Sequence, residues 1–152
     1  MRLSVETLID APRERVFARL LDVTRWPETI RGIESVELLT PGPIAVGSRI
    51  RETRHMHGRK ASEVMTLAEI EKPARLVLTA ENHGTRYRVM HLLKAEGGAT
   101  RLGLHLEGEP VTLLARLFIP LAWLMRGVVK RQLAADLADL KQALERDSGA
   151  AP

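Results

Sequence analysis

Residues 128–145 read VVKRQLAADLADLKQALE, and apolar side chains recur in this stretch at spacings of three and four residues. This is the period of a helix with one apolar face. The stripe is formed by Leu133, Leu137, Leu140 and Leu144. An apolar stripe of this length needs a large surface to cover it, and in this chain only a sheet is large enough. The stretch therefore predicts a long C-terminal helix packed across a sheet.

The residues before this helix, 111–126, are apolar almost all round. Pro120 cannot donate an amide hydrogen bond inside a helix and Gly127 weakens a helix, so we expect an element in two parts. The first part is then a gate or lid, a buried helix, or a contact in a homodimer. Basic residues lie around it, which also favours a membrane surface. They are Arg116, Arg126, Lys130 and Arg131.

Upstream of residue 108 the pattern is one of strands joined by short turns. Six runs are rich in alternating apolar residues, and turn-forming residues separate them. These runs are 33–39, 48–55, 60–71, 75–81, 85–95 and 100–107. A seventh strand is expected at 3–9, followed by two short helices at 12–21 and 25–30. This order predicts an α+β fold in which a curved, seven-stranded antiparallel sheet wraps around the C-terminal helix.

A straight helix cannot fill a strongly concave sheet, so a cavity is expected between them. The chain has only five aromatic residues to fill that space, and an unfilled apolar space is a natural site for a small ligand. We expect one domain over residues 1–146 and a disordered tail over 147–152.

Composition excludes several other classes of protein. The chain has no cysteine, which rules out disulfides and thiolate metal sites. The net charge is +4, but basic and acidic residues are interspersed and aromatic residues are few, so we expect no nucleic-acid partner. No apolar run reaches the length that spans a bilayer or resembles a signal peptide, so we expect a cytoplasmic protein.

The opening stretch, residues 5–39, reads VETLIDAPRERVFARLLDVTRWPETIRGIESVELL. With its Ala11-Pro12, Val16-Phe17 and Trp26-Pro27 pairs it resembles the start of START-like (SRPBCC) proteins, near the polyketide cyclase/dehydrase-like branch. The segments at 46–53, 69–81, 97–109 and 137–145 are also similar, so the resemblance covers residues 3–146. It implies a helix-grip fold around a hydrophobic cavity that takes lipids, polyketides or other small apolar ligands. Some members of the family are cyclases or hydrolases, and many only bind.

Two polar residues are expected to point into the cavity from one strand. Tyr87 and His91 share a face with Val89, whereas Arg86 and Arg88 belong on the solvent face. His91 could act as an acid or base near neutral pH, and Tyr87 could donate a hydrogen bond. The alternative is that both are satisfied structurally.

Two charged residues share a face with the apolar Ile50. If Ile50 points inward, Glu52 and Arg54 do so too, and buried charges must be paired. Such a pair could orient a carboxylate or a hydroxyl of a ligand, unless both side chains reach solvent at an edge. The expected ligand contacts are Trp26, Ile50, Glu52, Arg54, Val64, Thr66, Leu78, Tyr87, Val89, His91, Leu104, Leu117, Leu121 and Trp123.

No metal or cofactor is expected. His55 and His57 share a strand face, but the sequence implies no third ligand, so a solvated turn is the better interpretation. The sequence also lacks a nucleophile elbow, a phosphate loop and a dinucleotide fingerprint. Three functions remain open. They are a carrier or sensor of a small hydrophobic molecule or lipid, an enzyme that uses His91, Tyr87 or Glu52, and an interaction module built on residues 113–125.

Overall fold

In the computed structural model, which describes residues 1–56 and 58–150, seven antiparallel strands form one sheet in the order β1-β7-β6-β5-β4-β3-β2. The strands are β1 (Arg2–Ile9), β2 (Ile33–Leu38), β3 (Arg49–Met56), β4 (Arg59–Glu71), β5 (Arg75–Asn82), β6 (Thr85–Glu96) and β7 (Ala99–Pro110). The helices are α1 (Arg13–Leu21), the 3-10 turn η1 (Val23–Arg25), α2 (Trp26–Thr29), α3 (Leu113–Leu117), α4 (Ile119–Leu124) and α5 (Arg126–Ala150). The expected helix-grip architecture is confirmed.

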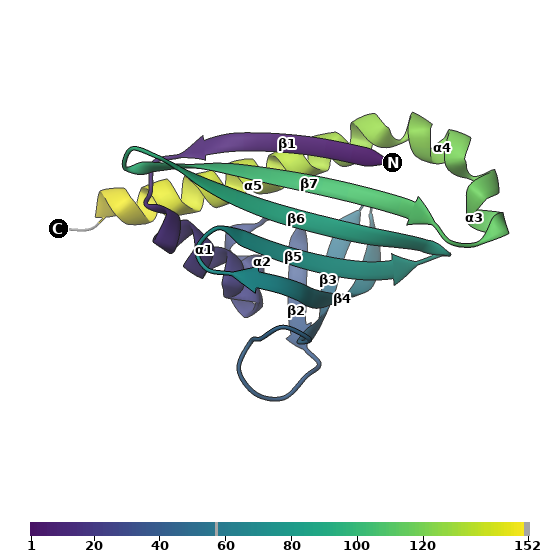
Figure 1. The fold of residues 1–152 in the computed structure, drawn as a ribbon, viewed down its shortest axis with the longest axis horizontal. Coiled ribbons are helices and arrows are strands. Elements are labelled where there is room, and N and C mark those ends of the chain that lie inside the picture. Colours follow the sequence, from purple (N-terminus) through teal and green to yellow (C-terminus); the bar gives the residue numbers. More distant parts are fainter. Residues whose placement is uncertain (57, 151–152) are drawn as a thin grey trace.

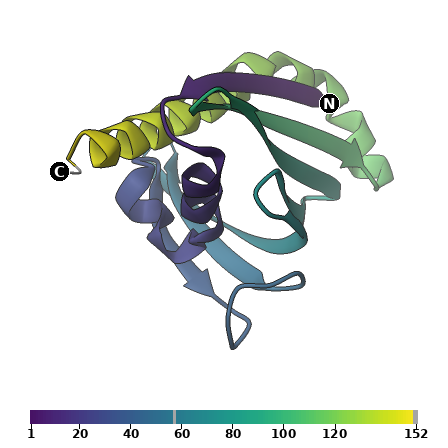
Figure 2. The same ribbon diagram turned by 60° about the vertical axis from the view of Figure 1, so that its left-hand side comes forward.

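The sheet is strongly bent. Strands β2 and β3 run at a steep angle to β1, β7 and β6, β4 bends to run alongside β5, and α5 extends past β1 along the length of the molecule (Figures 1 and 2). The helices α1 and α2 lie near the C-terminal part of α5 (Figure 1). Leu137, Leu140 and Leu144 of α5 are each less than 5% exposed and belong to the same core cluster as Leu76 and Leu102 of the sheet. The apolar stripe read from the sequence is therefore the face of α5 that packs into the core.

Register determines which side chains of β3 and β4 face inward. Met56 pairs with Arg59 next to the turn, and this pairing sets the register of the rest of the hairpin. Glu52 therefore lies directly opposite Glu63. The alternation of β4 shifts later, because the pairing with β5 skips Ala68 between Leu67 and Glu69. A bulge of this kind moves the following residues to the other face.

The helical region after the sheet differs in detail from the expected two-part element. It is divided into α3, α4 and α5, with breaks at Phe118 and Met125. Pro120 lies in the first turn of α4, where its missing amide hydrogen costs nothing. Strand β7 continues past residue 107 to Pro110, because Thr85 of β6 still pairs with it.

Residues 147–150 of the tail that was expected to be disordered belong to a helix. Helix α5 continues to Ala150, and the side chain of Arg19 on α1 donates to Asp147. Residues 151–152 of that predicted tail lie outside the described residues. No helix in the described part of the chain is long and apolar enough to cross a membrane. The cytoplasmic location stays a prediction.

Candidate functional site

A cavity of about 410 Å³ lies between the sheet, α2 and the first half of α5. This volume is within the range of small-molecule sites. Most of its wall is apolar, with side chains from β4–β7 and from the helices. The apolar lining includes Leu20, Trp26, Ile30, Met65, Leu78, Ala80, Val89, Leu104, Leu106, Leu133, Leu137 and Leu140. The cavity is therefore a site for a mainly apolar ligand.

The cavity opens between the β3–β4 hairpin and the first turns of α5. Met56 and Ala61 line it from the hairpin and are exposed, whereas Val129 and Gln132 line it from α5 and are half-buried. Deeper lining residues such as Leu78 and Leu104 are less than 5% exposed. A ligand would therefore enter past the start of α5.

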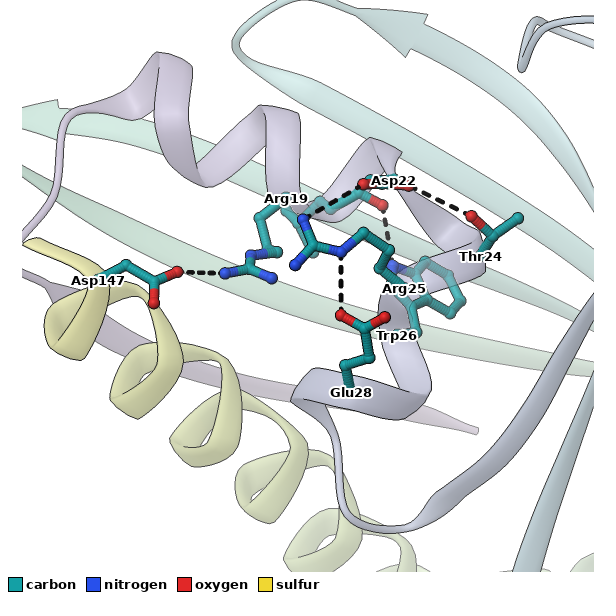
Figure 3. Close-up of polar contacts among 8 residues, drawn as sticks. Arg19, Asp22, Thr24, Arg25, Trp26, Glu28 and Asp147 are labelled. Carbon is teal, nitrogen blue, oxygen red and sulfur yellow. Dashed lines mark hydrogen bonds and ion pairs between the residues drawn. The ribbon is translucent and has the colours of Figure 1, made fainter.

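Trp26 closes the cavity at the α2 side. Its indole Nε1 donates a buried hydrogen bond of 3.0 Å to the carbonyl oxygen of Leu20, which fixes the ring. Two sets of polar contacts lie at this corner of the fold: Arg19 with Asp147, and Arg25 with Asp22 and Glu28 (Figure 3). Trp26 is consequently a rigid part of the wall.

One end of the cavity is polar. The guanidinium of Arg54 donates from Nε to Glu52, and it donates to both carboxylate oxygens of Asp136 on α5 at 2.8 and 3.2 Å. All three side chains are less than a fifth exposed and line the cavity. Burial lowers the pKa of Arg54, but the two carboxylates outweigh burial and raise it, so the guanidinium stays charged. Its donors are largely occupied by protein carboxylates.

The same end carries an excess of acidic groups. Glu63 lines the cavity directly opposite Glu52 and forms no ion pair with any described residue. Burial, followed by repulsion from Glu52, raises the pKa of Glu63. Burial likewise raises the pKa of Glu52 and of Asp136 against the opposing effect of Arg54. Three carboxyl groups thus surround one cation. This arrangement favours a ligand group that donates hydrogen bonds and disfavours an anionic ligand group.

Tyr87 and His91 both line the cavity from β6, as the alternation of that strand predicts. His91 is only 9% exposed, and within the described residues its Nδ1 has no hydrogen-bond partner. Burial lowers the pKa of His91 to about 4, with a hydrogen bond to the backbone of Leu76 acting in the opposite direction. His91 is therefore neutral near pH 7, and its Nδ1 is buried without a hydrogen-bond partner among the described residues.

Eight of the residues expected to contact a ligand line this cavity. They are Trp26, Glu52, Arg54, Leu78, Tyr87, Val89, His91 and Leu104. Ile50 is fully buried in the core cluster and does not reach the cavity.

The expected inward orientation of Val64 and Thr66 is corrected by the structure. Glu63 and Met65 face the cavity instead, because inward Glu52 pairs with Glu63 and fixes the alternation of β4 up to its bulge. Leu117, Leu121 and Trp123 do not line the cavity either. They belong to α3 and α4, which project from the body of the fold and bury none of their residues.

Sequence reasoning missed the two acidic residues that complete the polar end. Glu63 could have been found, because the short turn between β3 and β4 sets its pairing with Glu52. Asp136 had no comparable signal, since it is a polar residue beside an apolar stripe and lies 82 positions from Arg54. Only the packing of α5 on the sheet brings the two together.

Of the two histidines considered for metal binding, only His55 lies among the described residues. His55 lies 3.4 Å from Glu34 on the surface, and His57 lies outside the described residues. Across residues 1–56 and 58–150, no three potential ligands gather around a common point. A second pocket lies between α1, Ile44 and Pro73. It is more open to solvent than the cavity under α5.

The sequence profile of the family described as "polyketide cyclase / dehydrase and lipid transport" matches residues 1–145. The chain belongs to this family. Its members have the START-like fold, and the cavity described above is the interior of that fold. Among curated proteins, none matches the chain in sequence.

Solved structures share the fold across nearly the whole chain. The Zhui aromatase/cyclase from Streptomyces sp. R1128 superposes with a TM-score of 0.81 at 16% identity, covering 99% of this chain and 96% of its own. The protein TTHA0849 from Thermus thermophilus gives 0.78 at 20% identity, covering 97% and 99%. A START superfamily protein from Mycobacterium smegmatis gives 0.76 at 14% identity, covering 95% and 97%. At these identities the likeness establishes the fold alone.

Proposed function

We propose that this protein binds one small, mainly apolar molecule in the cavity under α5, as a carrier or sensor. The observation that carries the proposal is the cavity itself, with apolar walls and a single polar end. The family description, which includes lipid transport, is in keeping with it.

The polar end narrows the class of ligand. Arg54 already donates to Glu52 and Asp136, and Glu63 adds a further carboxyl group without adding a cation. A ligand carboxylate would meet like charges there, whereas a hydroxyl or an amine would find acceptors. The proposed ligand therefore has an apolar body and a polar group that donates hydrogen bonds.

An enzyme of the cyclase, dehydrase or hydrolase kind is the second candidate, because the structural neighbours include the Zhui aromatase/cyclase and two di-domain ARO/CYC proteins. Tyr87 and His91 are separated by about 13 Å along β6, and Glu52 is three strands away. These residues form no acid–base pair joined by a hydrogen bond. The depressed pKa of His91 also makes it a weak base near pH 7. Binding without catalysis is therefore the better-supported function.

The test is titration of the whole chain with an apolar fluorescent probe. One probe should bind per chain, and Ala80→Trp or Val89→Trp should weaken that binding by about tenfold or more because each would fill the cavity. Val64→Trp is the matched control, since Val64 lies outside the cavity lining, and it should leave probe binding unchanged. Thermal unfolding of each variant shows that it is folded.

The ligand class is tested by displacing the probe with three twelve-carbon molecules that differ only in the polar group. We expect dodecylamine and dodecanol to displace it at lower concentration than dodecanoate. Tightest binding of dodecanoate would overturn the assignment of the polar end. Equal probe binding by the parent and both filling variants would overturn the cavity as the binding site.

A further inference from the structure

Helices α3 and α4 form an exposed apolar arm, defined here as residues 113–125. Neither helix buries a residue, and Leu113, Leu117, Trp123 and Leu124 are between 68% and 80% exposed. In Figure 1 the arm projects beyond the ends of β6 and β7, at the end of the molecule away from the C-terminus. Soluble monomers rarely leave so large a contiguous apolar surface in water, so this one indicates a contact with something apolar.

The arm is held in this position at both ends. Before it, the amides of Val111 and Thr112 donate to the carbonyl oxygen of Gly84, and the hydroxyl of Thr112 caps α3 by accepting from Ala115 at 3.1 Å. After it, the guanidinium of Arg126 donates to the carbonyl oxygen of Arg2 at 3.2 Å. The arm is thus anchored to the start of β1 and to the β5–β6 turn.

The charged residues within the arm and in the first turns of α5 are all basic. From Pro110 to Ala135 the sequence contains no acidic residue, although acidic and basic residues alternate closely elsewhere. Its basic residues are Arg116, Arg126, Lys130 and Arg131, all exposed. Within residues 1–56 and 58–150, none of the four forms an ion pair with the protein. The apolar surface is therefore bordered by cations that have no counterion among the described residues.

An apolar surface bordered by basic residues distinguishes between two possible contacts of the arm, a second copy of the chain and a membrane. In a two-fold dimer the same patch meets itself, so the basic residues of one copy would lie near those of the other. An anionic membrane surface offers an apolar layer together with negative charge, and tryptophan is favoured at its boundary. We propose that the arm docks the protein on anionic lipid membranes, with Leu117, Trp123 and Leu124 inserted and the basic residues at the headgroups.

The position of the arm relates docking to the cavity. Helix α5 begins directly after the arm, and its first turns carry Val129 and Gln132, which line the cavity near its mouth. A docked arm would therefore bring the cavity mouth to the membrane, so that an apolar ligand could pass between bilayer and cavity. This transfer rests on the proposed function, whereas the docking does not.

The test uses the full chain and vesicles of two compositions, phosphatidylcholine alone and phosphatidylcholine with about 30% phosphatidylglycerol. Co-sedimentation should show binding to the anionic vesicles and little to the neutral ones, and added salt should weaken it. The fluorescence of Trp123 should shift to shorter wavelength on binding. In Trp123→Phe the shift should disappear, because the remaining Trp26 is already buried.

Matched variants test separately the apolar side chains and the basic side chains of the proposed membrane contact. Leu117→Ser with Leu124→Ser should weaken vesicle binding by about tenfold or more. The control Val46→Ser changes a side chain that is 62% exposed outside the arm, and should have no effect. Lys130→Gln with Arg131→Gln should weaken binding more than Arg49→Gln with Lys94→Gln, which removes the same charge elsewhere.

Binding of the apolar probe tests the cavity, whereas binding of vesicles tests the arm, so the two proposals can fail independently. The Leu117→Ser, Leu124→Ser variant should still bind the apolar probe, which shows that it is folded. The docking proposal is overturned if that variant binds anionic vesicles as the parent does, or if the parent does not bind them. A concentration-dependent dimer in sedimentation velocity that the same variant abolishes would also overturn it, in favour of a second copy as the occupant.

Discussion

Glu52 and Glu63 lie directly opposite each other on β3 and β4, and both line the cavity. Like charges in directly paired positions of a sheet destabilise it. Arg54 and Asp136 complete the group, but the single guanidinium cannot neutralise three carboxylates. The chain thus retains an arrangement that weakens the fold at the place where a ligand's polar group would sit, as is common for functional sites.

Glu63→Gln should stabilise the protein near neutral pH. Burial, with repulsion from Glu52, raises the pKa of Glu63 in the folded state, so ionising it weakens the fold. That penalty is absent below the unfolded pKa and grows as pH rises through the folded pKa. The gain should be about 0.5–1 kcal/mol near pH 7 and close to zero at about pH 4, as measured by urea unfolding. The control Glu37→Gln, which loses a surface ion pair with Arg51, should give no gain at neutral pH.

Arg54→Met should destabilise the protein strongly. It removes the only cation from a buried group and leaves Glu52 and Asp136 without a partner, which typically costs about 3–5 kcal/mol. Arg51→Met is the matched control, because the ion pair of Arg51 with Glu37 is solvent-exposed and should contribute less than about 1 kcal/mol. Equal losses in the two variants, measured by denaturant unfolding, would contradict the role assigned to Arg54.

His91→Phe should make the protein less sensitive to mild acid. The folded pKa of His91 is about 4, below its unfolded value, so the unfolded chain takes up this proton first as pH falls. Stability from the neutral ring is complete above the unfolded pKa and is lost progressively between about pH 6.5 and pH 4. The parent should lose about 2 kcal/mol through this group by pH 5, and the variant should not. Parallel stability curves for parent and variant between pH 7 and pH 5 would show that burial does not control this histidine.

Gly84→Ala should cost more than Gly97→Ala, although both glycines have positive φ. At Gly84 an added Cβ would overlap the hydroxyl of Thr112, which caps α3, whereas nothing lies within 4 Å of the same atom at Gly97. We expect a loss of about 1 kcal/mol at Gly97 from the backbone alone and about 2–3 kcal/mol at Gly84. The difference should also appear as weaker vesicle binding, because Thr112 sets where the arm begins.

Many of the cavity-lining residues could be predicted from the alternation of side chains along single strands. The inward face of β6 was predicted from Tyr87, Val89 and His91, because Arg86 and Arg88 belong on the opposite face, and all three residues line the cavity. The same reasoning failed on β4, where Val64 and Thr66 were expected inside. Alternation there is interrupted by a bulge at Ala68, and no glycine or other turn residue marks that position in the sequence. Before the bulge, odd-numbered side chains of β4 face the cavity. After the bulge, even-numbered side chains lie on that face.

The sequence by itself determined the elements, their order and the apolar stripe of α5, because hydrophobic periodicity and turn residues act over a few positions. Tertiary structure alone decided that Asp136 meets Arg54 and that the apolar arm stays outside the core. Both depend on how α5 lies across the curved sheet. That geometry is the sum of many weak packing contacts between residues far apart in the chain, and no short stretch of sequence encodes it.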